Sequence, residues 1–375
     1  VVLHHPDEVG KKYRLATDDD VATYGAAAEH LKQVLKDWPH PEDPLPTETI
    51  PTYELRRVAL PLYGMERWVD VFNLRQQLAL VTFLERIKAS YEGISDEASR
   101  LATQTNAGVD ADDLAKAVLG YLGIVLNKTV DYNSRLTRWA NHGEYVGNTL
   151  SRQALSMAWD YFELNQVGNT GGDWLAQLEW VVRYIRKTSW SAASQAKAQR
   201  KSATNLLHAD SSFDVVVTDP PYYDNVPYAA LSDFFYVWFK RSLGKHFPES
   251  FSTPLIPKTG EIVHDRPHKR SDSIKTKEHF EAKLGDSFKE MHRVLKPGGI
   301  AVIVYAHKTT EGWETMLNGL VDAGFVVTGS WPIHTEMKSR LVAAQTAALA
   351  SSIYMVCRKT EREALGFWND IQPQI

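Results

Sequence analysis

The spacing of apolar residues along the first half of the chain predicts helices. Apolar side chains recur at the three- and four-residue spacing of one helix face between residues 74 and 87 and between residues 114 and 125. Five prolines and several acidic residues in 38–51 predict an extended connector. Further helices are predicted over 22–36, 150–163 and 174–187.

The pattern changes after a polar stretch at 188–200. Residues 213–218, FDVVVT, are a short β-branched run of the kind found in parallel strands that are covered on both faces. Strand, helix, strand, helix and then two closely spaced strands is the order of half a doubly wound α/β sheet that ends in an antiparallel hairpin. The later strands are predicted at 300–305, 325–331 and 352–356, with helices over 280–295 and 310–323.

These patterns divide the chain into two regions of an α/β protein. Residues 1–200 are expected to be mainly helical, with the proline-rich connector near 38–51. Residues 201–375 are expected to carry the sheet and the catalytic residues. The length of 375 residues, 43% of them apolar, is sufficient for two packed regions.

Composition narrows the class of protein. The longest apolar stretches, such as 117–126 and 300–306, are far shorter than the roughly 20 residues of a membrane-spanning helix. One cysteine, Cys357, excludes an intrachain disulfide and a cysteine-based zinc site, and it favours a reducing compartment. We therefore expect a cytoplasmic protein that makes no contact with a membrane.

The net charge of the chain does not identify its binding partner. A net charge of −4 excludes a chain coated in positive potential, but local basic patches can still meet a polyanion. A basic loop at 257–277 could hold phosphates, with Lys258 as a predicted substrate contact, and a solvated loop explains the pattern equally well. No metal site is expected, because His264 and His268 have no further ligands beside them. The other basic residues of the loop are Arg266, Lys269, Arg270, Lys275 and Lys277.

The candidate chemistry lies directly after the strand at 213–218. The lone pair of a nucleobase amino group is delocalised into the ring, so accepting hydrogen bonds from both of its N–H groups favours the pyramidal transition state of methyl transfer. Asp219 offers a carboxylate, and Pro220 offers a carbonyl in a rigid loop continued by Pro221. Tyr222 offers an aromatic face for a base removed from its helix.

The surroundings of this motif favour a functional interpretation over a chance proline turn. The motif follows a hydrophobic strand, at the edge where open α/β sheets bind ligands. An aromatic run follows it, and most of this run is expected to belong to a following helix and to pack in the protein core. The run is Tyr223, Tyr228, Phe234, Phe235, Tyr236 and Trp238. Substrate contacts are predicted at Tyr223, Asp224, Asn225 and Tyr228.

Residues 218–240, TDPPYYDNVPYAALSDFFYVWFK, resemble the catalytic motif of a family of bacterial and archaeal adenine-specific DNA methylases. These are large proteins, often found in defence loci and named for an inserted zinc ribbon. The resemblance implies a Rossmann-like methyltransferase sheet, of which the C-terminal half is evident here. It also implies S-adenosylmethionine as cofactor and DNA as partner. Similarity extends to 63–82, 131–139, 152–163, 292–307 and 324–333.

The same resemblance suggests cofactor contacts. In the wider class of amino-methyltransferases, a segment ahead of a helix contacts the methionine end of S-adenosylmethionine, and Phe72, Asn73 and Gln76 are similar to it. The usual threonine-proline pair is replaced here, and a helix capped by Asn73 explains these residues equally well. Ser202 and Thr204 are similar to the element that holds the adenine ring, with a plain strand or loop as the alternative.

A glycine-rich turn after a first strand, which the class uses to bind the cofactor, is not found. The glycines at 168–172 follow a predicted helix end and are interpreted as a loop. In the resembled family that turn lies toward the N-terminus. The expectation is therefore a C-terminal fragment or one subunit of a split enzyme, with the glycine-rich motif on a missing N-terminal segment or a partner subunit.

The function predicted from the sequence is methylation of adenine N6 in DNA. Cytosine-N4 methylation uses the same geometry and more often has serine in place of Asp219. RNA or a protein glutamine amide would suit the same chemistry. A rival of another class is a DNA-binding subunit that keeps the fold without catalysis.

Overall fold

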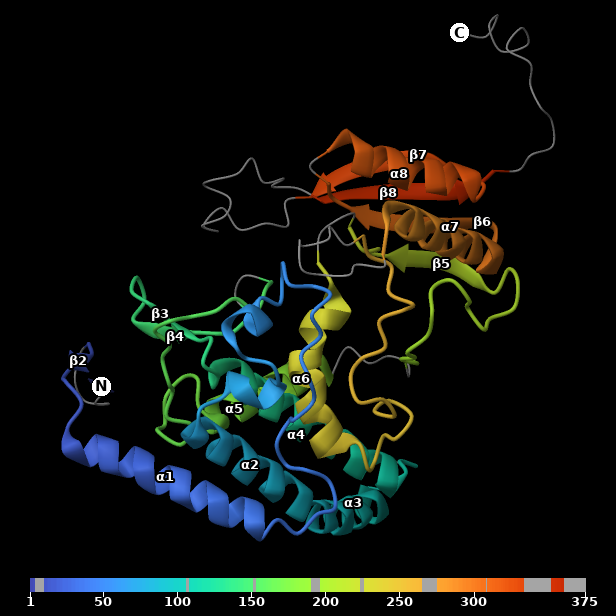
Figure 1. Ribbon diagram of the computed structural model, residues 1–375. Helices are drawn as coiled ribbons and strands as arrows, with labels where there is room; N and C mark the ends of the chain where they lie inside the picture. The colour runs from blue at the N-terminus through green and yellow to red at the C-terminus, as the bar shows by residue number, and fades with distance from the viewer. Residues whose placement is uncertain are drawn as a thin grey trace, which may run out of the picture. The chain divides into compact units, whose positions relative to one another are not determined.

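The computed structural model describes residues 1–3, 10–105, 108–150, 153–189, 196–222, 226–264, 275–307, 309–333 and 352–360. Internal contacts divide the chain into two compact units (Figure 1). The described part of unit 1 is 1–196 with 228–258, and that of unit 2 is 197–227, 259–264 and the residues from 275 onward. The segment 228–258 thus follows the predicted boundary in sequence but packs with unit 1.

Unit 1 is mainly helical, as its apolar spacing predicts. Of the predicted helices, those near 22–36, 74–87, 114–125 and 174–187 are confirmed. Its helices are α1 (Asp18–Lys36), α2 (Leu74–Ala89), α3 (Tyr91–Thr105), α4 (Ala111–Tyr132), α5 (Trp174–Thr188) and α6 (Tyr228–Leu243), with short 3-10 helices at Leu60–Tyr63 and Trp68–Val71. Its strands are β1 (Val2–Leu3) paired with β2 (Lys12–Tyr13), and β3 (Arg138–Ala140) paired with β4 (Tyr145–Gly147).

The helix predicted over 150–163 is wrong for the part of it that the structure describes. Residues 153–163 are irregular. Leu155 is fully buried, and its N–H donates to the carbonyl of Arg57 at 2.7 Å while its carbonyl accepts from Ala59 at 3.1 Å. Backbone hydrogen bonds to a distant segment replace those of a helix here, so the apolar spacing is satisfied by another conformation.

An aromatic cluster forms the centre of unit 1. The ring of Phe72 stacks on Phe234 at 5.9 Å and meets Trp238 edge-on at 5.5 Å, and Trp68 lies 6.3 Å from Phe234. All four side chains are buried. Of the aromatic run after the motif, Phe234, Tyr236 and Trp238 are thus buried as predicted, and the cluster explains why α6 belongs to unit 1.

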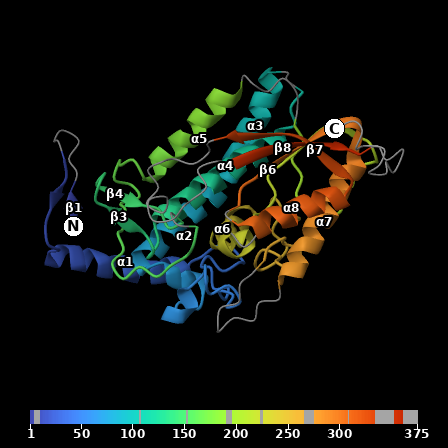
Figure 2. The same cartoon turned by 90° about the horizontal axis from the view of Figure 1, so that it is seen from above.

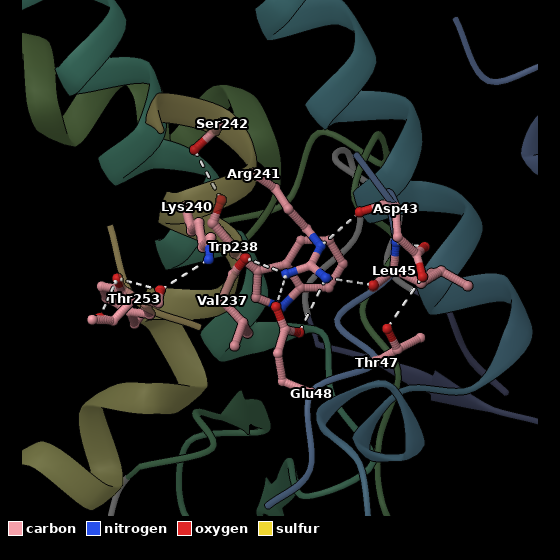
Figure 3. Close-up of polar contacts among 11 residues, drawn as sticks. Asp43, Leu45, Thr47, Glu48, Val237, Trp238, Lys240, Arg241, Ser242 and Thr253 are labelled. Atoms are coloured by element: carbon pink, nitrogen blue, oxygen red, sulfur yellow. Dashed lines mark hydrogen bonds and ion pairs between the residues drawn. The ribbon is translucent and has the colours of Figure 1, made fainter. Parts of the chain in front are cut away.

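The proline-rich connector is held by a buried arginine (Figure 3). Within 38–51 the chain forms neither helix nor ladder beyond a single bridge at Thr49. The guanidinium of Arg241 donates to the carbonyls of Asp43 (2.9 Å) and Leu45 (2.6 Å) and forms two 3.0 Å bonds to the carboxylate of Glu48. Because a guanidinium is planar and rigid, one side chain fixes the path of several connector residues.

Unit 2 contains a four-stranded mixed sheet in the order β5-β6-β8-β7. β5 is parallel to β6, while β8 is antiparallel to both of its neighbours, β6 and β7. The predicted strands, helices and antiparallel hairpin are confirmed, but the position of β8 between β6 and β7 was not predicted. The elements are β5 (Phe213–Thr218), α7 (Lys277–Val294), β6 (Leu295–Tyr305), α8 (Thr310–Asp322), β7 (Phe325–Ile333) and β8 (Ser352–Lys359).

Both helices of unit 2 cover the same face of the sheet (Figures 1 and 2). Alternate residues Ala301, Ile303 and Tyr305 of β6 point into a core shared with α7 and α8. Val215 and Val217 of β5 lie on the opposite face, 53% and 66% exposed. The expectation that β5 is covered on both faces is therefore wrong among the described residues, because α7 and α8 cover only one face.

Cys357 of β8 is buried in this core, and its burial raises the pKa of the thiol to about 11. The thiolate is the reactive form, so we expect Cys357 to resist a disulfide reagent at pH 8 in the folded protein and to react rapidly in denaturant. Because the unfolded thiol ionises at lower pH, its burial stabilises the fold below pH 9, and this stabilisation declines as the pH rises toward 11. Counting modified thiols with and without urea tests this; rapid labelling of the native protein would contradict it.

In the part of the chain that the structure describes, no helix combines the length and the apolar character that crossing a bilayer requires.

Candidate active site

The Asp219–Tyr222 motif lies at the carboxyl edge of the unit 2 sheet. Thr218, the last residue of β5, pairs with Ile303 of the parallel strand β6, so both strands end at the same edge. Asp219 is exposed, and Pro220 is buried directly behind it. The fold therefore presents a carboxylate to solvent at the edge where ligands bind in open α/β sheets.

Tyr222 is oriented by an aromatic partner that sequence reasoning did not identify. Its ring meets Tyr305 edge-on, with centroids 5.3 Å apart and planes at 80°. Tyr305 is fully buried at the end of β6, and its hydroxyl donates to the carbonyl of Gly312 at 3.1 Å. Burial on β6 and the hydroxyl hydrogen bond both restrict Tyr305, so its ring is a fixed packing surface for Tyr222. The sequence feature that could have identified Tyr305 is its position at the end of the predicted strand that follows β5.

Residues between β6 and α8 also lie at the carboxyl edge of the sheet, beside Tyr305. The backbone N–H of Thr309 donates to Nδ1 of His307 at 3.1 Å, and the indole of Trp313 donates to the His307 carbonyl at 3.1 Å. Trp313 also meets Tyr305 edge-on at 5.1 Å. A Cβ on Gly312 would lie 2.2 Å from the His307 ring, so a larger residue there would displace this ring. Tyr305, His307 and Trp313 are thus additions to the site that the sequence did not mark.

Of the four predicted substrate contacts that follow the motif, the structure describes one. Tyr223, Asp224 and Asn225 lie outside the described residues. Tyr228 is exposed at the first turn of α6 in unit 1.

Lys258 is engaged within unit 1. Its ammonium forms a 2.8 Å ion pair with the buried carboxylate of Asp233 and donates to the carbonyl of Ile256 at 2.7 Å. Asp233 also accepts from the N–H of Ile256 at 2.9 Å. This network explains Lys258 through packing, because a buried carboxylate requires a partner. A DNA contact by Lys258 stays a prediction.

The predicted cofactor element Phe72–Gln76 is the capped start of α2. The Asn73 side chain accepts from the N–H of Gln76 at 2.9 Å, and the Gln76 side chain accepts from the N–H of Asn73 at 2.9 Å. This reciprocal pair is a capping box, which is the alternative that the sequence left open. Phe72 lies in the aromatic cluster. The Nε2 atom of Gln76 is buried with no hydrogen-bond partner among the described residues.

A hollow of about 550 Å³ opens beside this helix start in unit 1. Phe72 and Asn73 line it, which keeps a cofactor contact compatible with the capping role. The Asn73 amide donates to the Tyr161 hydroxyl and to the Glu163 carboxylate, both at 3.0 Å. Volumes of 300–1,000 Å³ are typical of small-molecule sites. The hollow is also lined by Tyr24, Tyr63, Gly64, Met65, Asp70, Leu74, Gln77, Arg135 and Met157.

Ser202 and Thr204 lie in a turn ahead of β5. Their hydroxyl oxygens are 2.8 Å apart. Arg293 of α7 holds the following residues, because its guanidinium donates to the carbonyls of Leu206 (2.7 Å) and His208 (2.8 Å). Arg293 also hydrogen-bonds Glu290, which lowers the pKa of that carboxyl. The segment that follows the turn is therefore bound to α7, and a contact of the turn with adenine stays a prediction.

The basic stretch 257–277 is only partly described. Arg266, His268, Lys269 and Arg270 lie outside the described residues. Lys275 pairs with Glu261 at 3.0 Å and Lys277 with Glu311 at 2.7 Å. Among the residues with described positions, no group of three or more histidine, cysteine or acidic side chains is arranged for a metal ion.

No protein-family model and no curated protein matches the chain. Among solved structures, it is similar to TTHA0409 from Thermus thermophilus, a protein assigned as a DNA modification methylase, and to SpnF, a (4+2)-cyclase. Two TTHA0409 structures share 15% identity with TM-scores of 0.22 and 0.24, covering 45% and 47% of this chain and 54% and 58% of theirs. SpnF shares 15% identity with a TM-score of 0.23, covering 49% of this chain and 62% of its own. The alignments thus span less than two thirds of those proteins.

Similarity at this level shows neither a substrate nor an activity. The sheet itself is informative, because three strands run in one direction and the antiparallel β8 lies between β6 and β7. The order and directions of the described strands match those of the C-terminal part of a Rossmann-like methyltransferase sheet, and the predicted fold class is confirmed.

Proposed function

We propose that this chain methylates an exocyclic amino group in DNA, with adenine N6 as the target. The observation that carries the proposal is the exposed Asp219 at the carboxyl edge of β5, followed by the buried Pro220 and the oriented Tyr222. A strand end, a carboxylate, a rigid carbonyl and an aromatic face occur together there. A protein that only bound DNA would not require this combination.

The chemistry follows from the groups that the motif presents. The Asp219 carboxylate and the Pro220 carbonyl are acceptors without competing donors, so together they can hold both N–H groups of the target amine. This favours the pyramidal nitrogen of the transition state over the planar ground state. Tyr222 stacks on the extruded base while Tyr305 fixes its angle. The amine loses its proton after attack, so no general base is required beforehand.

S-adenosylmethionine is the proposed cofactor, and when bound it supplies an electrophilic methyl group. Phe72 and Asn73 line a hollow of sufficient volume for such a molecule, and the buried amide nitrogen of Gln76 beside them has no hydrogen-bond partner among the residues that the structure describes. We propose that these residues of unit 1 contact the methionine end of the cofactor. A contact of Ser202 and Thr204, in unit 2, with the adenine ring stays a separate prediction. Calorimetric titration with S-adenosylmethionine tests this; no heat of binding would exclude it for this chain alone.

Adenine is favoured over cytosine because the motif begins with aspartate, whereas cytosine-N4 enzymes more often have serine. The test is to incubate the protein with unmethylated DNA and labelled S-adenosylmethionine and to identify the modified nucleoside by mass spectrometry. We expect N6-methyladenine. N4-methylcytosine as the product would show that cytosine, and not adenine, is the target base. No transfer to DNA, despite bound cofactor, would contradict the proposal and favour a DNA-binding subunit.

Tyr222 gives a second test at the same site. We expect Tyr222→Ala to lower kcat/KM for DNA by about 10- to 100-fold, because base–aromatic stacking is worth about 1–3 kcal/mol. Tyr222→Phe keeps the ring and should retain most of the activity. Steady-state kinetics at several DNA concentrations measure both variants. A loss as large in Tyr222→Phe as in Tyr222→Ala would show that the ring does not act by stacking.

A further inference from the structure

Helix α5 of unit 1 exposes an unusual combination of side chains. It packs against α4, and Trp174 in its first turn stacks on Phe83 of α2 at 4.3 Å with ring planes 8° apart. Gln177 and Val181 are buried on the same side. Trp180 and Tyr184, three and seven residues after Gln177, lie at the border of this buried side and are 60% and 64% exposed. Neighbouring apolar side chains that form one exposed patch are a feature of binding sites, whereas single exposed residues are ordinary.

The exposed rings are interleaved with cations. Trp180, Arg183, Tyr184 and Lys187 are spaced by three or four residues, so they form one stripe, here called the α5 face. It extends for about 10 Å along the helix. The Arg183 guanidinium lies 5.6 Å from the centre of the Trp180 ring and is paired with Glu179 at 2.6 Å. These contacts hold the ring and the cation side by side before any ligand arrives.

The charge of this surface contrasts with that of the chain. Helix α5 carries three basic residues, Arg183, Arg186 and Lys187, against one acid, Glu179, while the whole chain has a net charge of −4. An acidic protein that binds a polyanion must do so through such a local basic patch. Protein–protein interfaces also use tryptophan, tyrosine and arginine, but their centres are depleted in lysine.

We propose that the α5 face binds unpaired DNA, with Trp180 and Tyr184 stacking on bases and Arg183 and Lys187 contacting phosphates. The choice of DNA rests on the proposed function. Bases in a duplex hide their faces in the stack, so two exposed rings fit a strand whose bases are accessible. An enzyme that extrudes a base produces such a strand locally. A stripe of about 10 Å corresponds to about three nucleotides at a rise of 3.4 Å.

Fluorescence anisotropy without cofactor tests the proposal on the full chain. The probes are a labelled single-stranded oligonucleotide, an abasic oligomer of the same length, and the duplex. Trp180→Ala and Tyr184→Ala should each weaken binding of the single strand about tenfold and leave the abasic oligomer unchanged. Trp180→Phe should retain stacking and most of the affinity. Leu175→Ala is the matched control, because Leu175 is equally exposed on the same helix but lies off the α5 face.

The charged residues have a separate readout. Arg183→Gln combined with Lys187→Gln should weaken binding of both oligomers and reduce the slope of log affinity against log salt by about 1.4, the value for two lost phosphate contacts on a single strand. Circular dichroism and thermal unfolding should stay unchanged for all variants, because the substituted side chains are exposed.

Three outcomes would overturn the inference. They are unchanged single-strand binding in Trp180→Ala and Tyr184→Ala, an equal loss with the abasic oligomer, and a change of oligomeric state in these variants, which would identify a protein interface. Methyl transfer is assayed separately. If methyl transfer is absent while single-strand binding depends on Trp180, the proposed function is wrong and the inference about the α5 face is supported. If methyl transfer is present and neither ring affects binding, only the inference about the α5 face is wrong.

Discussion

Replacing Asp219 by alanine is expected to lower the rate of methyl transfer to DNA by about 100- to 1,000-fold, the usual effect of removing one preorganised group that stabilises a transition state. Asp219 is exposed at the end of β5, so the fold should tolerate the change. Transfer of tritium from labelled S-adenosylmethionine to DNA measures it. Binding of DNA should change little, because the carboxylate acts on the pyramidal amine more than on the ground state.

Two variants make this result specific. Asp219→Asn keeps one oxygen acceptor and should lose less activity than Asp219→Ala. Asp214→Ala removes an exposed carboxylate from β5, the strand that Asp219 follows, where Asp214 pairs with Lys296 at 2.7 Å; it should leave the rate unchanged. If Asp219→Ala kept more than a tenth of the wild-type rate, the catalytic assignment would be wrong.

Replacing Arg241 by methionine is expected to lower the free energy of unfolding by about 3–5 kcal/mol, the effect of breaking a buried ion pair from one side. The Arg241 side chain is 6% exposed, and its loss leaves Glu48 and two connector carbonyls without their donor. Urea unfolding followed by far-ultraviolet circular dichroism measures the change.

The double substitution Arg241→Met with Glu48→Leu should recover part of this loss, because it removes the uncompensated carboxylate. Lys32→Met is the control, since Lys32 and Glu29 are both exposed and such pairs contribute about 0–1 kcal/mol. An equal effect of Arg241→Met and Lys32→Met would show that the connector is held by other contacts.

Local signals in the sequence predicted much of the fold. The β-branched run of β5 and the spacing of α2, α4 and α5 each depend on residues close together in the chain, and those elements are present. The irregular segment at Leu155 and the insertion of β8 between β6 and β7 depend on partners far away in sequence. The spacing of apolar residues does not predict which distant segment an element pairs with, because the same apolar residues can be buried by more than one backbone conformation.

The candidate site divides in the same way. The motif could be recognised because its four residues are contiguous and follow a strand. Tyr305 and Trp313 come from the next strand and helix of the sheet, so their place beside Tyr222 follows only from parallel pairing of β5 with β6. The buried role of Arg241 could not be predicted for a related reason. In the sequence it resembles the exposed basic residues that commonly end a helix such as α6.

The place of β8 in the sheet also sets the order in which unit 2 can assemble. During synthesis β5, β6 and β7 leave the ribosome before β8 does, yet in the described sheet β7 pairs with β8 alone. Until residues 352–359 emerge, β7 has no strand to join, and its exposed Trp331 and Ile333 lie on an open edge. The nascent chain therefore exposes an unpaired strand edge, open to pairing with another chain, in the interval between the synthesis of β7 and that of β8.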